Sequence, residues 1–409
     1  MKLARVAYVV NVFPKLSETF IANEMAELLR RGIEVRVLSL RQPTDTLRHE
    51  LIAQAGLESV TCCDPARFPE LLRAFEPQLL HAHFATEPAA AARDWARPLG
   101  VPFTFTAHGY DIHRKAPPDF AARAAAASVV VTVSKANRQY IINTFGVPAG
   151  KLRVIPSGVD TEQFRPVAAD ARRRSATPPI HDAGAPSSCS ASEAGIGSSR
   201  AGARRSSPVM VAKPGVPPWD SPHAGGYDSM PLLVCVARHV KVKNLGLLLQ
   251  ACAMLRDGGV RFRCVFIGDG VCREELEVLR TKLGLENIVE FVGAQAQGQV
   301  RAWWQRADLA VLSSDSEGMP VCLMEAAACA VPAVATAVGG IPELVVHGET
   351  GLLTPAGDAR AFARALQELI EDPKRAATMG GAARDRMVAR FSLARQVDEL
   401  LAVWSEVLR

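Results

Sequence analysis

Two acidic side chains eight residues apart carry the strongest chemical signal in this sequence. Glu317 and Glu325 lie in the run DSEGMPVCLMEA, residues 315–326. A carboxylate pair at this spacing could accept hydrogen bonds from hydroxyls at two ends of one extended ligand. The alternative is structural, an N-cap acid followed by an acid on a helix surface. That alternative is weaker for Glu325, because its neighbours are apolar and a buried Glu needs a partner.

Backbone groups beside these acids could bind an anion. The apolar run Leu309–Leu312 predicts a strand, and Pro320 suits the first turn of the helix that should follow. Gly318 and Met319 would then present free N–H groups at a helix N-terminus, where negative charge is stabilised.

Histidines mark the ends of two other predicted strands. His108 follows the run Phe103–Ala107, and ligands bind at the carboxyl ends of parallel strands. His81 and His83 alternate, so only one of them need face a cleft. A metal site built from these three histidines is chemically open but disfavoured, and no Asp-x-Asp motif is present. For each histidine a structural role is the alternative.

Two further loop motifs argue against a cofactor. Gly268 and Gly270 form a Gly-x-Gly turn after a strand, but the G-x-G-x-x-G pattern is absent, which excludes a dehydrogenase. Glu343, after the pair Gly339-Gly340, is expected to be structural. We therefore expect neither a cofactor nor a metal.

The composition is that of an ordinary globular protein. Of the 409 residues 48% are hydrophobic and 22% charged, which excludes disordered, collagen-like and coiled-coil chains. The net charge of +5 suits anionic ligands or an anionic membrane surface, but it is too weak to predict nucleic-acid binding. The nine cysteines are odd in number and form no CxxC pair, so we expect reduced thiols in a cytoplasmic protein. No apolar run reaches 18 residues, which argues against a membrane span.

Apolar runs alternate with helix-period segments in two stretches. This alternation predicts an α/β fold of two doubly wound, Rossmann-like domains that face each other across a cleft, over residues 1–165 and 231–390. The expected strands are 6–10, 34–40, 79–82, 103–107, 129–133, 152–155, 232–237, 264–268, 288–292, 309–312, 333–336 and 351–353. The expected helices include 20–30, 244–256, 273–283, 300–306, 321–328, 341–346 and 359–371.

Residues 166–230 interrupt this pattern. They are rich in Ala, Ser, Gly, Pro and Arg and lack apolar periodicity, which predicts a disordered interdomain insertion. A flexible linker is the preferred interpretation, and a regulatory or partner-binding arm is the alternative. The final segment, 391–409, has apolar residues at helical spacing and predicts a helix, which in the simplest interpretation caps the second domain.

Four segments together resemble a known family. The run SEGMPVCLMEAAACAVPAVATAVGGIPELVVHGETGLLTPAGD resembles the E-x7-E region of the family 4 retaining glycosyltransferases, which have the GT-B fold. FTAHGYDI, VIPSGVDTEQF and VARHVKVKNLGLLLQA resemble other segments of that family, in the same order. FPKLSETFIANEMAELLRRGIEVRVLSL further resembles bacterial exopolysaccharide transferases such as those for colanic acid.

The resemblance implies roles for individual residues. The two cations of the third segment, Arg238 and Lys243, would clamp a pyrophosphate, Glu317 would bind the transferred sugar, and Glu325 the ribose. The implied donor-binding set is Arg238, Lys243, Gly268, Glu317, Gly318, Met319, Pro320, Val321 and Glu325. The implied catalytic set is His108, Arg238, Lys243 and Glu317, and the implied acceptor side is Ser17, Glu18, Thr19 and His83. The last helix would cross back onto the first domain.

The implied activity is sugar transfer from a nucleoside-diphosphate sugar to an acceptor hydroxyl, with retention and without a metal. The acceptor would be a glycan or a lipid-linked oligosaccharide in cell-surface glycan synthesis. The protein would then be cytoplasmic, and its charge permits peripheral attachment to the inner face of the membrane. A nucleotide-sugar epimerase or phosphorylase of the same fold, and a catalytically silent sugar-nucleotide-binding protein, are the alternatives.

Three positions depart from the family pattern. Ser157 replaces the usual Asn of an Asn-Gly-Val-Asp segment, which puts the role of that loop in doubt. Ala330 stands where Gly is common, and Ala327 where Met is common. These changes affect packing more than charge.

Overall fold

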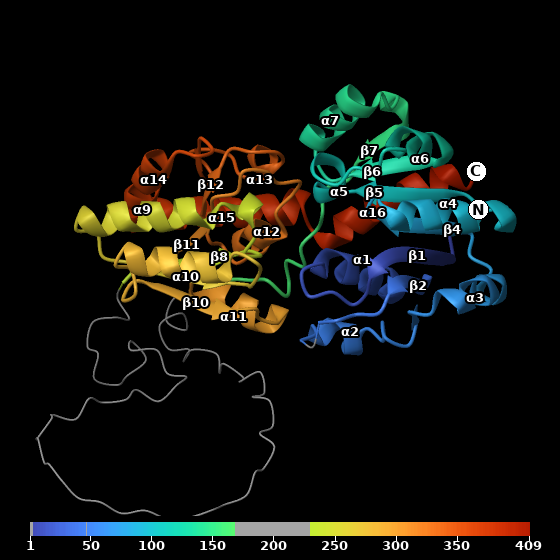
Figure 1. Ribbon diagram of the computed structural model, residues 1–409, viewed down its shortest axis with the longest axis horizontal. Coiled ribbons are helices and arrows are strands. Elements are labelled where there is room, and N and C mark those ends of the chain that lie inside the picture. The colour runs from blue at the N-terminus through green and yellow to red at the C-terminus, as the bar shows by residue number, and fades with distance from the viewer. Residues whose placement is uncertain (1–2, 46, 168–229) are drawn as a thin grey trace, which may run out of the picture.

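The computed structural model describes residues 3–45, 47–167 and 230–409 (Figure 1). The predicted insertion at 166–230 therefore lies outside the described residues, apart from positions 166, 167 and 230. Within the described residues, no helix is both long enough and apolar enough to cross a membrane.

Two parallel sheets form the framework and confirm the predicted pair of Rossmann-like domains. In the described residues the first sheet has the strand order β3-β2-β1-β4-β5-β6-β7 and the second β10-β9-β8-β11-β12-β13, with parallel pairing throughout. The first sheet contains β1 (Arg5–Val12), β2 (Glu34–Arg41), β3 (Thr61–Cys62), β4 (Leu79–His83), β5 (Phe103–Ala107), β6 (Val129–Thr132) and β7 (Leu152–Val154). The second contains β8 (Leu232–Val236), β9 (Arg263–Ile267), β10 (Val289–Gly293), β11 (Leu309–Leu312), β12 (Ala333–Thr336) and β13 (Gly351–Thr354).

Helices cover both faces of each sheet, as the apolar character of the strands requires (Figure 1). Strands β4, β5 and β6 are buried along their whole length, and separate clusters of buried apolar residues lie against the two faces of the first sheet. The first domain has α1 (Thr19–Arg30), α2 (Glu50–Gln54), α3 (Phe68–Phe75), α4 (Glu87–Leu99), α5 (Tyr110–His113), α6 (Phe120–Ala126) and α7 (Lys135–Phe145). The second has α9 (Leu245–Asp257), α10 (Arg273–Lys282), α11 (Gln297–Arg306), α12 (Val321–Ala328), α13 (Ile341–Leu344), α14 (Ala359–Glu371) and α15 (Pro373–Arg390), followed by α16 (Leu393–Val407).

Strand register brings two of the predicted histidines together. In the pairing of β4 with β5, His83 lies opposite Thr106. Because the strands are parallel, His108 follows β5 at the same edge of the sheet at which β4 ends in His83. The two rings therefore meet, with 5.3 Å between their centroids.

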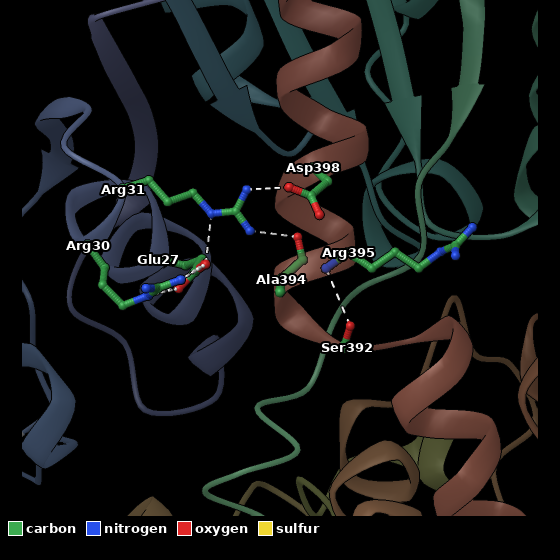
Figure 2. A network of polar contacts seen from close by, with 7 residues as sticks. All are labelled: Glu27, Arg30, Arg31, Ser392, Ala394, Arg395 and Asp398. Carbon is green, nitrogen blue, oxygen red and sulfur yellow. Dashed lines mark hydrogen bonds and ion pairs between the residues drawn. The ribbon is translucent and has the colours of Figure 1, made fainter.

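The last helix, α16, packs against the first domain rather than the second (Figure 1). Val397, Leu400 and Trp404 belong to the same buried cluster as residues of β1 and α1. A polar network also joins α16 to the end of α1 (Figure 2). Arg31 donates hydrogen bonds to Asp398 Oδ1 at 2.5 Å and to the Ala394 carbonyl at 2.8 Å.

Candidate functional site

A cavity of about 350 Å³ lies between the two domains. Its lining draws on the loops that follow β5, β8 and β11, so the carboxyl ends of both sheets face it. The predicted residues that line it are Ser17, Glu18, His108, Arg238, Glu317, Gly318, Met319 and Val321. The other predicted residues, Thr19, His83, Lys243, Gly268, Pro320 and Glu325, do not contribute to this lining.

Glu317 is tied to the rest of its loop and to a cation. Its Oε1 accepts a hydrogen bond from Ser314 Oγ at 2.6 Å and pairs with Lys243 Nζ. Burial by itself would lower the pKa of Lys243, but the Glu317 carboxylate outweighs burial and raises it. Lys243 is therefore a cation held behind the cavity wall, with Glu317 between it and the cavity.

Arg238 provides positive charge in the cavity itself. It follows β8, its side chain is exposed, and its guanidinium has no hydrogen-bond or ion-pair partner in the part of the chain that the structure describes. An unpaired guanidinium in a cleft is a ready partner for a phosphate, which it can bind through two parallel hydrogen bonds.

Glycines allow the two domains to approach closely at this site. A Cβ built on Gly318 would lie 2.5 Å from the His108 carbonyl oxygen, and one built on Gly109 would lie 3.2 Å from the Gly318 nitrogen. No side chain fits between these loops. The N–H groups of Gly318 and Met319 have no acceptor among the described residues, which leaves both free at the start of α12.

Gly268 supports the loop that carries Arg238. Its φ of +132° is in the region that favours glycine, and a Cβ there would lie 2.0 Å from the Ala237 carbonyl oxygen. Gly268 therefore allows the β9 and β8 loops to pack together, which positions Arg238 from behind.

Glu325 is buried in the second domain, with 5% of its surface exposed. Burial raises its pKa to about 7, and the side chains of Gln297 and Trp304 on α11 act in the opposite direction. This opposite effect is that of hydrogen bonds to the Glu325 carboxylate, although the two buried donors, Gln297 Nε2 and Trp304 Nε1, do not reach ideal hydrogen-bond geometry. Glu325 is thus a buried acid whose near neighbours are two donor groups on α11.

The residues predicted for the acceptor side lie in two different places. Ser17 and Glu18 line the cavity, and Glu18 Oε1 pairs with Lys15 Nζ at 2.5 Å. His83, expected on the acceptor side of the cleft, is instead 1% exposed and lies beneath His108, so it cannot contact an acceptor directly.

Sequence reasoning did not identify Glu24, although α1 carries a signal for it. Glu24 lies three residues after Ile21 and four before Leu28, on the apolar face of the helix, and it is 2% exposed. Ligand atoms of Glu24, His81 and His83 lie within 4.8 Å of one another, a geometry that could hold a metal. Hydrogen bonds already occupy these groups: His81 contacts Thr104 and Thr106, and His83 contacts Glu24 and His108.

Two family models match the chain in sequence. The model for glycosyltransferase family 4 matches residues 17–163, and the model for glycosyl transferases group 1 matches residues 223–386. The colanic acid biosynthesis glycosyltransferase WcaL of Salmonella typhimurium is 40% identical over 146 residues, which are 34% of this chain and 36% of the relative. The amylovoran biosynthesis glycosyltransferase AmsK of Erwinia amylovora is 34% identical over 178 residues, 41% of this chain and 44% of the relative. The chain thus matches less than half the length of these curated relatives.

Solved structures show the same architecture. Anabaena Alr3699/HepE, crystallised with UDP-glucose, superposes with a TM-score of 0.73 at 18% identity, over 98% of this chain and 99% of that chain. This likeness confirms the predicted GT-B arrangement of two Rossmann-like domains.

Proposed function

We propose, from the match of residues 17–163 to the model for glycosyltransferase family 4 and of residues 223–386 to the model for glycosyl transferases group 1, that this chain transfers a sugar from a nucleoside-diphosphate sugar to an acceptor hydroxyl. The proposal includes retention of anomeric configuration and independence of a metal. The observation that carries it is the cavity in which the unpaired Arg238 lies beside the Glu317–Lys243 pair and the free N–H groups of Gly318 and Met319.

Donor binding would rearrange the charges of this site. The pyrophosphate would bind Arg238 and attract Lys243 away from Glu317, because a diphosphate carries more negative charge than one carboxylate. Glu317 would then be free to accept hydrogen bonds from hydroxyls of the sugar. In this scheme Glu325 accepts from the ribose hydroxyls. The site thus couples recognition of the diphosphate to recognition of the sugar.

Transfer requires charge stabilisation on the donor side. As the bond between the anomeric carbon and the phosphate oxygen breaks, negative charge develops on the departing diphosphate, where Arg238 and Lys243 can stabilise it without a metal. The acceptor oxygen forms the new bond on the face that the diphosphate leaves, and its proton moves to a diphosphate oxygen. Ser17 and Glu18, on the first-domain side, are the residues we assign to the acceptor.

The two relatives are named for colanic acid and amylovoran biosynthesis, which supports exopolysaccharide synthesis as the setting. We propose a glycan or lipid-linked oligosaccharide as the acceptor. HepE was crystallised with UDP-glucose, so a UDP-sugar is the first donor to test.

A thermal-shift panel with UDP, GDP, ADP and CMP tests the donor site. A ligand at about 100 times its Kd stabilises a protein by ~2.7 kcal/mol, which corresponds to several degrees at ~2–4 °C per kcal/mol. We expect one diphosphate to raise Tm in the wild type and to lose that effect in Arg238→Ala. Arg261→Ala is the matched control, because Arg261 precedes β9 at the opposite end of the sheet. If none of the four nucleotides shifts Tm in the folded wild type, the proposed donor site is refuted.

Product analysis separates transfer from the rival activities. With the nucleotide that binds, we would supply the matching labelled sugar donor with and without an acceptor extract. Transfer yields labelled acceptor and free nucleoside diphosphate. An epimerised donor formed without acceptor, or a sugar phosphate formed only with inorganic phosphate, would replace the proposal by the epimerase or the phosphorylase.

A further inference from the structure

Three side chains, Glu24, His83 and His108, are linked by hydrogen bonds into a relay that leads from the core of the first domain to the cavity. Glu24 Oε1 lies 3.2 Å from His83 Nε2, and His83 Nδ1 lies 3.0 Å from His108 Nε2. The planes of the two imidazoles are inclined by 22°, which suits an N–H···N bond in the ring plane. Only His108 reaches the cavity wall. The other two residues can therefore influence a bound ligand only through His108.

Glu24 is a carboxylate fixed by its hydrogen-bond donors. Tyr8 Oη donates to Glu24 Oε1 at 2.6 Å, and Gln396 Nε2 donates to Oε2 at 2.6 Å. Two donors from different elements thus point at this carboxylate, as an ionised acid requires. An ionised carboxylate only accepts hydrogen bonds. His83 Nε2 must therefore carry a proton toward Glu24.

The positions of the remaining protons follow from this constraint. The contact between Glu24 and His83 is longer than the ~2.7–2.9 Å of a charge-assisted ion pair, which favours a neutral His83. A neutral imidazole with a proton on Nε2 has a lone pair on Nδ1. His108 Nε2 must then donate to it. This leaves the lone pair of His108 Nδ1, which has no partner among the described residues, available to the cavity.

Packing prevents the His108 ring from escaping this arrangement. The rings of Phe20 and Phe84 each lie 4.7 Å from it, between centroids. The backbone of His108 is held as well: its N–H donates to Asp111 Oδ1 at 2.9 Å, and its carbonyl accepts from Asn137 Nδ2.

We propose that Glu24 and His83 are positioning residues that hold His108 as its Nε2–H tautomer, so that His108 Nδ1 accepts a hydrogen bond from a hydroxyl of the donor sugar. This inference rests on the proposed sugar transfer. It adds two residues to the site that do not touch the substrate. It also accounts for the burial of His83.

The variant Glu24→Gln tests the relay with little change in volume. The amide can turn its NH₂ toward His83, which would reverse the direction of the hydrogen bonds in the relay. His83 would accept at Nε2 and donate from Nδ1, and His108 would then carry its proton on Nδ1. In serine proteases, a comparable carboxylate-to-amide change preserves the geometry and leaves the histidine in the wrong tautomer.

Nitrogen NMR of ¹⁵N-histidine-labelled protein reads the tautomer without any substrate. We expect the wild type to show His108 protonated on Nε2 and Glu24→Gln to show it protonated on Nδ1, with His108→Asn used to assign the signals. A wild-type His108 protonated on Nδ1, a cationic His83, or an unchanged tautomer in Glu24→Gln would each overturn the proposal. Because this readout needs no donor, it stands even if the proposed function fails.

Kinetics test whether the tautomer matters to the reaction. With UDP-glucose or GDP-mannose, whichever the wild type hydrolyses or transfers, we expect kcat of Glu24→Gln to fall about 10- to 100-fold with little change in KM, by analogy with metal-binding histidines that lose their supporting carboxylate. Trp404→Phe is the control: it removes a buried hydrogen bond to Thr104 and keeps an aromatic ring beside Tyr8, and it removes no hydrogen bond of Glu24, His83 or His108. An equal fall in kcat for Trp404→Phe, or an unchanged kcat for Glu24→Gln, would reduce Glu24 to a structural role. If the wild type turns over neither donor while the nucleotide panel is also negative, the proposed function fails instead.

Discussion

At the scale of single residues, burial gives Glu325 a role in the pH dependence of stability. Its pKa is about 7 in the folded protein, above its value near 4.5 in an unfolded chain. Between these values the folded state binds more protons than the unfolded state. The free energy of unfolding should therefore fall as pH rises from about 4.5 to 7 and then level off.

Glu325→Gln should remove this part of the pH dependence. The amide keeps the size of the side chain and cannot ionise. Urea denaturation at pH 5 and pH 8 should show the wild type losing up to about 3 kcal/mol more than the variant between the two values. Equal losses in both proteins would mean that Glu325 ionises in the fold at little cost, for example through hydrogen bonds that Gln297 and Trp304 form in solution.

At the scale of elements, the end of α12 is strained. The helix closes with two backbone bonds, from Val331 N–H to the Ala326 carbonyl and from Ala330 N–H to the Ala327 carbonyl. This pattern places Ala330 at the position where glycine is preferred, and its φ is +60°. The departure from the family pattern noted in the sequence thus has a structural cost.

Ala330→Gly should therefore stabilise the protein. Relief of the left-handed conformation, about 1–2 kcal/mol, exceeds the extra unfolded-state entropy of glycine, about 0.4–1 kcal/mol. Chemical denaturation should show a net gain of up to about 1 kcal/mol. The matched control is Ala377→Gly on the exposed face of α15, which should lose about 1 kcal/mol. A loss in both variants would contradict the strain at Ala330.

The sequence predicts the strands well, but it does not predict every helix. Every predicted strand is present with its bounds shifted by no more than two residues, because a strand buried on both faces must be an uninterrupted apolar run. The helix α15 was not among the predicted elements. It begins at the Asp372 cap, its buried face consists of small or flexible residues (Ala376, Met379, Ala383 and Met387), and Gly380 allows close contact with Ala330.

The residues of the site also differ in how far the sequence predicts them. Glu317, Arg238 and His108 lie at the ends of predicted strands, so topology alone brings them to one edge. Glu24 could not be joined to His83 from the sequence, because 59 positions separate them and only the packing of α1 over the sheet brings them into contact. The sequence did not single out Phe20 or Phe84 either, since an apolar residue at helical spacing, or one beside a strand end, usually belongs to the core.

At the scale of the whole molecule, Glu343 joins the two domains. It was expected to be structural, and the structure specifies how: its carboxylate accepts hydrogen bonds at 3.0 Å from the backbone N–H groups of Lys135 and Ala136, at the start of α7 in the other domain. A carboxylate at a helix N-terminus is stabilising. This contact favours the closed arrangement in which Gly109 meets Gly318.

Glu343→Ala should shift the molecule toward an open form. Loss of a helix cap costs about 0.5–2 kcal/mol, which changes the ratio of closed to open molecules about 2- to 30-fold. Small-angle scattering without ligand should show a larger radius of gyration, reduced again by the nucleotide that binds. Glu349→Ala, an exposed acid in the loop after α13, is the control and should scatter like the wild type. Identical scattering for Glu343→Ala would show that other contacts hold the domains closed.

The return of α16 to the first domain has a consequence for synthesis on the ribosome. The first domain is translated before the second, yet part of its buried surface, around Tyr8, is covered by Trp404 and Val397. That surface stays exposed until residues 393–407 have left the exit tunnel. The nascent first domain must therefore wait, incompletely folded and with apolar surface open to chaperones, for the second domain to be made.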